Sequence, residues 1–180
     1  MNPVFSRRVP EGDNIERAVC ERCGFVDYDN PKIVVGAVVT CGPRVLLCRR
    51  AIAPRKGLWT LPAGYMEHGE TPEEGARRET YEEATADIVI EGLLAVYTIR
   101  RLGQVQLIYR ARMEAGAFAP GPESEAVGLF AEDEIPWDAI AFPTVHWALA
   151  HARQPGGPFV NPPGGDESGP DAPPYTVTGA

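Results

Sequence analysis

Runs of apolar residues divide the middle of the chain into short, regularly spaced elements. Residues 33–41 (IVVGAVVTC) and 44–50 (RVLLCRR) predict a hairpin that turns at Gly42 and Pro43. Two longer apolar runs later in the chain are separated by a turn at residues 101–103. Together the runs predict strands at residues 33–41, 44–50, 59–61, 88–99, 104–112 and 126–130.

A helix is predicted between the third and the fourth of these strands. Thr71 is a good N-cap, Pro72 fits the first helical position, and Glu74 completes a Thr-x-x-Glu capping box. Residues 142–152 predict a second helix that closes the fold. This order of strands and helices favours an α/β fold, an α/β/α sandwich with a mixed sheet.

Composition separates the chain into three parts. Residues 1–30 form a polar arm with two cysteines, residues 31–153 contain the predicted elements, and residues 154–180 contain seven prolines and six glycines. With 180 residues, 44% of them hydrophobic, the chain can bury one core. We expect the tail at 154–180 to be disordered or loosely packed, because it has few apolar side chains. A partner-binding tail is the alternative.

The segment at residues 64–85 concentrates negative charge. It holds seven glutamates and two arginines, a net charge of −5 within a total of −8. Glu79, Glu82 and Glu83, the acidic triplet, fall at i, i+3 and i+4 and project from one side of a helix. Like charges at this spacing weaken a helix, and a hard divalent cation such as Mg²⁺ would offset the repulsion. A solvated, charged helix face is the alternative.

The same segment resembles the Nudix box, G-x5-E-x7-R-E-U-x-E-E-x-G-U, in which U is an aliphatic residue. Gly64, Glu70, Arg78 and the acidic triplet all fall on the prescribed positions. Thr80 stands where an aliphatic residue is usual, and Thr85 replaces the second glycine. That glycine lies at the helix end, where a left-handed residue is common. The substitution leaves the geometry of the helix end open and touches none of the carboxylates, so we expect catalysis to survive it.

The resemblance implies the Nudix fold and a metal-dependent pyrophosphatase that hydrolyses a nucleoside diphosphate linked to another moiety. Most of residues 18–152 is similar to a subgroup that acts on ADP-ribose and FAD. This similarity implies ADP-ribose and/or FAD as the substrate, AMP as a product, and a homodimer. A Nudix-like ligand-binding or regulatory module that does not hydrolyse its ligand is the alternative.

The resemblance also implies roles for individual residues. The expected ligands of Mg²⁺ or Mn²⁺ are the Gly64 carbonyl, Glu79, Glu82 and Glu83. The expected catalytic residues are Glu79, Glu82, Arg78 and Glu125. The general base is either a member of the acidic triplet or a later glutamate, for which Glu123 and Glu125 are the candidates. Arg50 is a candidate phosphate contact, and the candidates for stacking on a substrate ring are Trp59, Tyr65, Tyr97 and Tyr109.

Cys20 and Cys23 have the spacing of one zinc-ribbon knuckle. The arm resembles the second half of the zinc ribbon found before some Nudix domains, with the first knuckle missing. Structural zinc sites use four ligands, so we expect no zinc to be bound by this chain alone. Cys41 and Cys48 lie in apolar runs and are expected in the core. A zinc-ribbon nucleic-acid adaptor is the alternative hypothesis for the arm.

The acidic balance bears on the partners. A net charge of −8 and a pI near 4.9 disfavour unassisted binding to nucleic acid or to an anionic membrane. The sequence has no apolar run near the ~20 residues that span a membrane and no signal-peptide pattern. We therefore expect a cytoplasmic protein that binds a small-molecule dinucleotide, not nucleic acid or a membrane.

Overall fold

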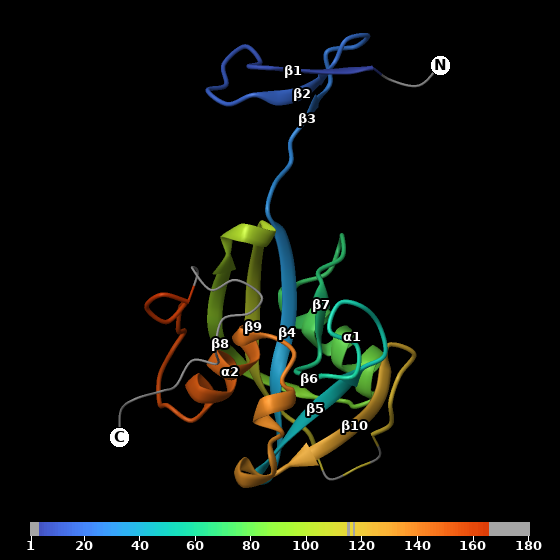
Figure 1. Ribbon diagram of the computed structural model, residues 1–180, viewed down its shortest axis with the longest axis vertical. Coiled ribbons are helices and arrows are strands. Elements are labelled where there is room, and N and C mark those ends of the chain that lie inside the picture. Colours follow the sequence, from blue (N-terminus) through green and yellow to red (C-terminus); the bar gives the residue numbers. More distant parts are fainter. Residues whose placement is uncertain (1–3, 115, 117, 166–180) are drawn as a thin grey trace. The chain divides into compact units, whose positions relative to one another are not determined.

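The computed structural model of the chain describes residues 4–114, 116 and 118–165 (Figure 1). The chain divides after Pro31 into two compact units. The N-terminal unit contains three short strands, and the larger unit contains all the strands and helices expected from the sequence. Within the described ranges, no helix has the length and apolar character needed to cross a membrane.

The N-terminal unit is an antiparallel sheet with the order β1 (Phe5–Arg8), β2 (Arg17–Cys20) and β3 (Val26–Asp27). After β2 the chain turns tightly, because the Gly24 N–H donates to the Cys20 carbonyl at 2.9 Å. The backbone N–H groups of Cys23 and Arg22 lower the pKa of the Cys20 thiol. The turn offers two thiols, and no third potential metal-binding side chain joins them in residues 4–31.

The larger unit is built on a sheet with the order β10-β5-β4-β9-β8. The central strand β4 (Lys32–Cys41) pairs antiparallel with β5 (Arg44–Arg50) and parallel with β9 (Gln104–Arg112). The edges are β8 (Val89–Ile99) and β10 (Ser124–Phe130). Two short strands, β6 (Trp59–Thr60) and β7 (Ala63–Tyr65), pair with β5 and β4. One parallel pair among antiparallel neighbours makes the sheet mixed, as predicted.

Two helices cover opposite faces of this sheet (Figure 1). The first, α1 (Pro72–Ala84), contributes Ala76 and Ala84 to a buried cluster with residues of β4, β5 and β9. The second, α2 (Pro143–Ala152), contributes Val145, Trp147 and Leu149 to a cluster with residues of β4, β5, β8 and β9. Since both faces of β4 are buried, its sequence is almost continuously apolar. The α/β/α sandwich predicted from the sequence is confirmed.

Strand β7 is not among the strands that the sequence predicts. Its residues pair with β4 at Gly36, where a Cβ would overlap Ala63 and lie 2.7 Å from the Pro62 carbonyl oxygen. Glycine at position 36 therefore lets β7 approach β4 closely. As a result, the start of the Nudix-like segment is fixed to the central strand of the sheet.

Residues 154–165 are fastened to the edge strand β8, unlike the loosely packed tail that composition favoured. The Phe159 N–H donates to the Leu94 carbonyl, and the Val96 N–H donates to the Phe159 carbonyl, each at 2.8 Å. The side-chain amide of Asn161 donates to the Thr98 carbonyl and accepts the Thr98 N–H, also at 2.8 Å. One phenylalanine and one asparagine supply these contacts, so average composition does not predict them. The rest of the predicted tail, residues 166–180, lies outside the described residues.

Candidate active site at the β7–α1 junction

The start of α1 is fixed by the predicted capping box. Thr71 Oγ1 accepts the Glu74 N–H at 3.2 Å, and Glu74 Oε2 accepts the Thr71 N–H at 2.8 Å. Gly75 allows the helix to approach the sheet, because a Cβ there would lie 2.6 Å from Glu70 Oε1 and 2.8 Å from Val35 Cγ2. The glycine therefore serves the close packing of α1 against Glu70 and the central strand.

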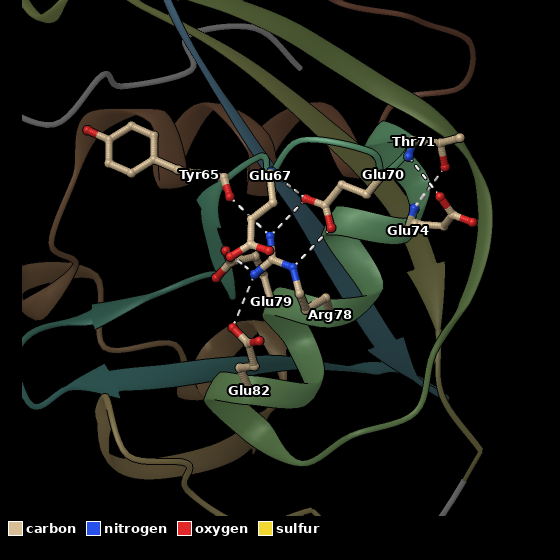
Figure 2. Close-up of polar contacts among 8 residues, drawn as sticks. All are labelled: Tyr65, Glu67, Glu70, Thr71, Glu74, Arg78, Glu79 and Glu82. Atoms are coloured by element: carbon tan, nitrogen blue, oxygen red, sulfur yellow. Dashed lines mark hydrogen bonds and ion pairs between the residues drawn. The ribbon is translucent and has the colours of Figure 1, made fainter.

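The Arg78 guanidinium is the centre of the polar network on α1 (Figure 2). It binds Glu70 in bidentate fashion, with Nε to Oε2 at 3.0 Å and Nη2 to Oε1 at 2.8 Å. Nη1 donates to Glu79 Oε1 at 2.8 Å and to Glu82 Oε2 at 3.1 Å, while Nη2 donates to the Tyr65 carbonyl at 3.0 Å. Five charge-assisted bonds match the five N–H donors of the guanidinium. Arg78 thus joins the β7–α1 loop to two members of the acidic triplet.

Glu79 and Glu83 lie on the buried side of α1, against β7. The Glu79 carboxylate is so close to Gly64 that a Cβ at position 64 would overlap it. Glu83 is 8% exposed, and its carboxylate accepts the Ala63 N–H. Its second oxygen, Oε2, is buried and has no hydrogen-bond partner within the described part of the chain. A buried polar atom in this state is costly, so it marks a place where a ligand or a proton would be stabilising.

The glutamates of this cluster have different proton affinities. Burial, and next the charge of Glu79, raise the pKa of Glu83 to about 8, although the Ala63 N–H and Arg50 act in the opposite direction. Burial also raises the pKa of Glu79, against the effect of Arg78. In contrast, the hydrogen bonds from Arg78 and the Glu67 N–H lower the pKa of Glu70 to about 2. Glu70 is therefore a permanent anion that holds Arg78, whereas Glu83 carries a proton near neutral pH in the absence of a cation.

The donor set suits a hard divalent cation, which prefers carboxylate and carbonyl oxygens. A cation would satisfy the unpaired Glu83 Oε2 and replace its proton. As the side chains stand, no three of them converge closely enough to hold an ion within the described ranges. Arg78 holds Glu79 and Glu82 on its own side, and the Glu82 side chain is 55% exposed. The residues fit the predicted Mg²⁺ or Mn²⁺ site, and their individual roles as ligands stay predictions.

The loop before β10 crosses the C-terminal end of α1. The Ala119 N–H donates to the Ala84 carbonyl at 2.9 Å, and the Gly121 N–H donates to the Glu83 carbonyl at 3.0 Å. Gly121 lies so close to the Glu82 carbonyl that a Cβ at position 121 would overlap it. Sequence reasoning did not single out this glycine, although the run Pro-Gly-Pro at 120–122 is a turn signal.

The two candidates for the later glutamate lie in different surroundings. Glu123 lies two residues after Gly121, the residue that contacts the end of α1. Burial is the main cause that raises the pKa of both Glu79 and Glu83, and the charge of Glu123 adds to it. Glu125 instead forms ion pairs with Arg49 Nε at 3.2 Å and with Lys56 Nζ at 3.8 Å. Of these two candidates, only Glu123 has a charge that acts on Glu79 and Glu83.

The end of α1 has left-handed backbone geometry at Thr85, the position where the Nudix box has glycine. Thr85 has φ 48° and ψ 30°, and its N–H donates to the Tyr81 carbonyl at 2.8 Å. A β-branched residue rarely adopts this conformation, which costs about 1–2 kcal/mol. The helix end therefore keeps the shape of the motif despite the substitution.

The predicted substrate-binding residues are distributed around the cluster. Arg50 lies near enough to lower the pKa of Glu83, and its guanidinium donates to the Pro54 carbonyl at 2.8 Å. Trp59 is half-buried and packs edge-on against Phe130, with ring centroids 4.9 Å apart. Tyr65 is 51% exposed, and its ring points away from Arg78 (Figure 2).

The other two tyrosines cannot stack on a substrate. Tyr97 is fully buried and Tyr109 is 5% exposed, so both rings belong to the core. Burial, more than any other effect, raises the pKa of Tyr109 to about 12. The suggestion that either ring is available to a ligand is wrong, because aromatic residues at inward strand positions pack in the interior.

Comparisons with known proteins identify both units. Residues 30–148 match the family model of the NUDIX domain, and residues 2–29 match a zinc-ribbon model described as Nudix N-terminal. A NUDIX hydrolase from Nitrosomonas europaea has a solved structure that is 44% identical, with a TM-score of 0.82. The match covers 88% of this chain and 93% of that chain.

Curated relatives match over shorter lengths. A MutT-like protein from Streptomyces ambofaciens is 37% identical over 57% of this chain and 64% of the relative. An ADP-ribose pyrophosphatase from Methanocaldococcus jannaschii is 27% identical over 61% of this chain and 67% of the relative. An NAD-capped RNA hydrolase NudC from Stutzerimonas stutzeri is 33% identical over 67% of this chain and 44% of the relative.

The chain thus spans about two thirds or less of the length of these curated relatives. The NUDIX model, however, covers well over half of the 180 residues, including the whole Arg78 network and the acidic triplet. The chain belongs to the Nudix family.

Proposed function

We propose that this protein is a metal-dependent hydrolase that cleaves the diphosphate of a nucleoside diphosphate linked to another moiety and releases AMP. The observation that carries the proposal is a pair of carboxylates, the partly buried Glu79 and the buried Glu83, that lie against Gly64 and Ala63. A diphosphate carries dense negative charge, which must be neutralised before a nucleophile can attack. A cluster of carboxylates binds cations, and the cations neutralise the charge of the diphosphate.

The proposed ligands of Mg²⁺ or Mn²⁺ are Glu79, Glu82, Glu83 and the Gly64 carbonyl. When bound, the cation supplies Lewis acidity that neutralises the diphosphate and acidifies water. Glu83 must be ionised to act as a ligand, and its pKa of about 8 therefore links cation binding to proton release. The geometry around Gly64 leaves room for the Glu79 carboxylate only because position 64 has no side chain.

Arg78 and a later glutamate complete the proposed catalytic set. Arg78 orients Glu79 and Glu82 through charge-assisted hydrogen bonds at 2.8 and 3.1 Å. Glu123 and Glu125 are the candidates for the general base that accepts a proton from the attacking water at a carboxylate oxygen. We place Glu123 first, because Glu125 would have to leave its ion pairs with Arg49 and Lys56.

ADP-ribose and FAD are the substrates that we propose first. A relative named ADP-ribose pyrophosphatase supports ADP-ribose, and FAD contains the same AMP half joined through a diphosphate. Arg50 would contact a phosphate, and Trp59 or Tyr65 would stack on a ring. A homodimer and a cytoplasmic location remain predictions.

A second candidate is hydrolysis of an NAD-type diphosphate, free or at the end of RNA. Relatives named NAD-capped RNA hydrolase and the match of residues 2–29 to a Nudix N-terminal zinc ribbon favour it. The net charge of −8 argues against an RNA partner. A ligand-binding module without hydrolysis is the third alternative, and the complete acidic triplet argues against it.

The test is a product-resolved screen of ADP-ribose, FAD, NADH and NAD-capped RNA with Mg²⁺ and with Mn²⁺. We expect AMP from ADP-ribose or FAD, and a loss of at least about 100-fold in kcat for Glu82→Gln. Glu91→Gln removes the same charge from an exposed position on β8 and is the matched control. Undiminished hydrolysis by Glu82→Gln would overturn the assigned roles, and a silent screen would favour the binding module.

A further inference from the structure

Thr85 stands where the motif has glycine, and its hydroxyl makes contacts that glycine cannot make. Thr85 Oγ1 accepts the Ala119 N–H at 2.8 Å and lies 2.8 Å from the Ala119 carbonyl oxygen, to which it can donate. The Ala84 carbonyl is a second acceptor at 2.8 Å. One exposed hydroxyl therefore holds both backbone groups of a residue that is 34 positions away in the sequence.

The loop held in this way leads directly to Glu123. Past Ala119, the Gly121 N–H donates to the Glu83 carbonyl at 3.0 Å, and the absence of a Cβ lets Gly121 rest on the helix end. On the far side, the Glu123 carbonyl accepts the Ala51 N–H at 2.8 Å. The backbone of residues 121–123 is thus held at both ends, and the Thr85 hydroxyl adds two hydrogen bonds to the backbone contacts that hold the first end.

The strained conformation of Thr85 indicates that its contact with the loop serves the site. A threonine at φ 48° is strained, and strained residues that persist often serve a site. Glycine would adopt the same backbone without strain but would leave only the backbone contacts to hold the loop. Threonine at this position thus adds two hydrogen bonds to Ala119 and carries backbone strain that glycine would avoid.

We propose that Thr85 is a positioning residue whose hydroxyl fastens the 119–121 loop to the end of α1 and thereby fixes the backbone that carries Glu123, two residues past Gly121. As far as it concerns hydrolysis, this inference rests on the proposed function. As far as it concerns the loop, it rests on the hydrogen bonds of Thr85 alone.

The experiment compares Thr85→Gly and Thr85→Val with Thr85→Ser, which keeps the hydroxyl. Thr98→Val, at an exposed position on β8 where the hydrogen bonds to Asn161 are made by the Thr98 backbone, is the matched control. Amide hydrogen exchange at Ala119 and Gly121 is measured on the metal-free protein, and Mn²⁺ affinity and the kinetics of AMP release are measured on the loaded protein. Glycine and valine should speed exchange at both amides and lower kcat about 10-fold with KM within about twofold, whereas serine and the control should match the unaltered protein.

A double variant ties the effect to Glu123. If Thr85 acts through Glu123, Thr85→Gly should add nothing to the loss caused by Glu123→Gln, because the carboxylate that it positions is already gone. Independent losses, an unaffected Glu123→Gln, or a Thr85→Gly variant with full kcat would each overturn the inference. If the protein hydrolyses none of the dinucleotides, the proposed function fails by itself. Unchanged exchange at Ala119 and Gly121 in Thr85→Gly would then overturn the inference on Thr85, and faster exchange would support it.

Discussion

Replacing Glu83 by glutamine should change how the stability of the metal-free protein depends on pH. The Glu83 carboxyl has an ordinary pKa of 4.5 in the unfolded chain and about 8 in the folded protein. Below pH 4.5 it is protonated in both states, so its burial costs no charge. Between these pKa values only the unfolded chain ionises, which lowers the free energy of unfolding as the pH rises, and above pH 8 the loss levels off.

The rise from 4.5 to about 8 corresponds to roughly 5 kcal/mol in total, of which about 4 kcal/mol falls between pH 5 and pH 9. Glutamine keeps the acceptor for the Ala63 N–H but cannot ionise. The variant should therefore gain about 4 kcal/mol relative to the unaltered protein from pH 5 to pH 9, on the order of 10 °C in Tm. The cost of burying an amide is the same at every pH, so it changes the offset between the two proteins and not this slope.

The assay is a series of thermal and guanidinium unfolding curves in EDTA at half-unit pH intervals, followed by circular dichroism. Glu91→Gln, with its half-exposed carboxylate, is the control for the loss of one negative charge. A difference in stability between Glu83→Gln and the unaltered protein that stays constant from pH 5 to pH 9 would refute the reasoning. Adding Mn²⁺ should stabilise the unaltered protein and have little effect on Glu83→Gln, because the ligand charge is missing.

Four further variants test other parts of the structure. Arg78→Gln removes the donors to Glu79 and Glu82 and should weaken Mn²⁺ binding or kcat about 10- to 100-fold, as measured by calorimetry and AMP release. Gly64→Ala places a methyl group on the Glu79 carboxylate and should weaken Mn²⁺ binding at least about 10-fold. Thr71→Ala removes the N-cap and should cost about 1 kcal/mol, roughly 2–4 °C in Tm. Phe159→Ala should cost about 1–3 kcal/mol in guanidinium unfolding, less than for a fully buried ring.

Local signals in the sequence predicted the parts of the fold that depend on nearby residues. The capping box at Thr71, the strands on either side of Gly42 and the long strands after the helix all lie where their patterns place them. The spacing of the acidic triplet also placed Glu79 and Glu83 on the same side of α1. These features succeed because hydrogen bonds within a helix or a hairpin link residues that are close in the sequence.

Contacts between distant residues could not be predicted in the same way. Nothing near Glu83 in the sequence indicates that the Ala63 N–H meets it, and nothing near Thr85 indicates Ala119. Glu125 and Glu123 have the same side chain two positions apart, and their surroundings differ because Arg49 and Lys56 come from another strand and loop. Such contacts are set by the packing of the sheet, which a single sequence does not reveal.

The segment around Phe159 has a practical consequence for handling the protein. An unprotected strand edge presents free amides and carbonyls to other molecules and promotes aggregation. Here the chain's own residues occupy the Leu94, Val96 and Thr98 positions of β8. A truncation that removes Phe159 and everything after it should therefore expose the edge of β8 and lead to aggregation and low solubility. A truncation that removes only residues 166–180 should leave this protection in place.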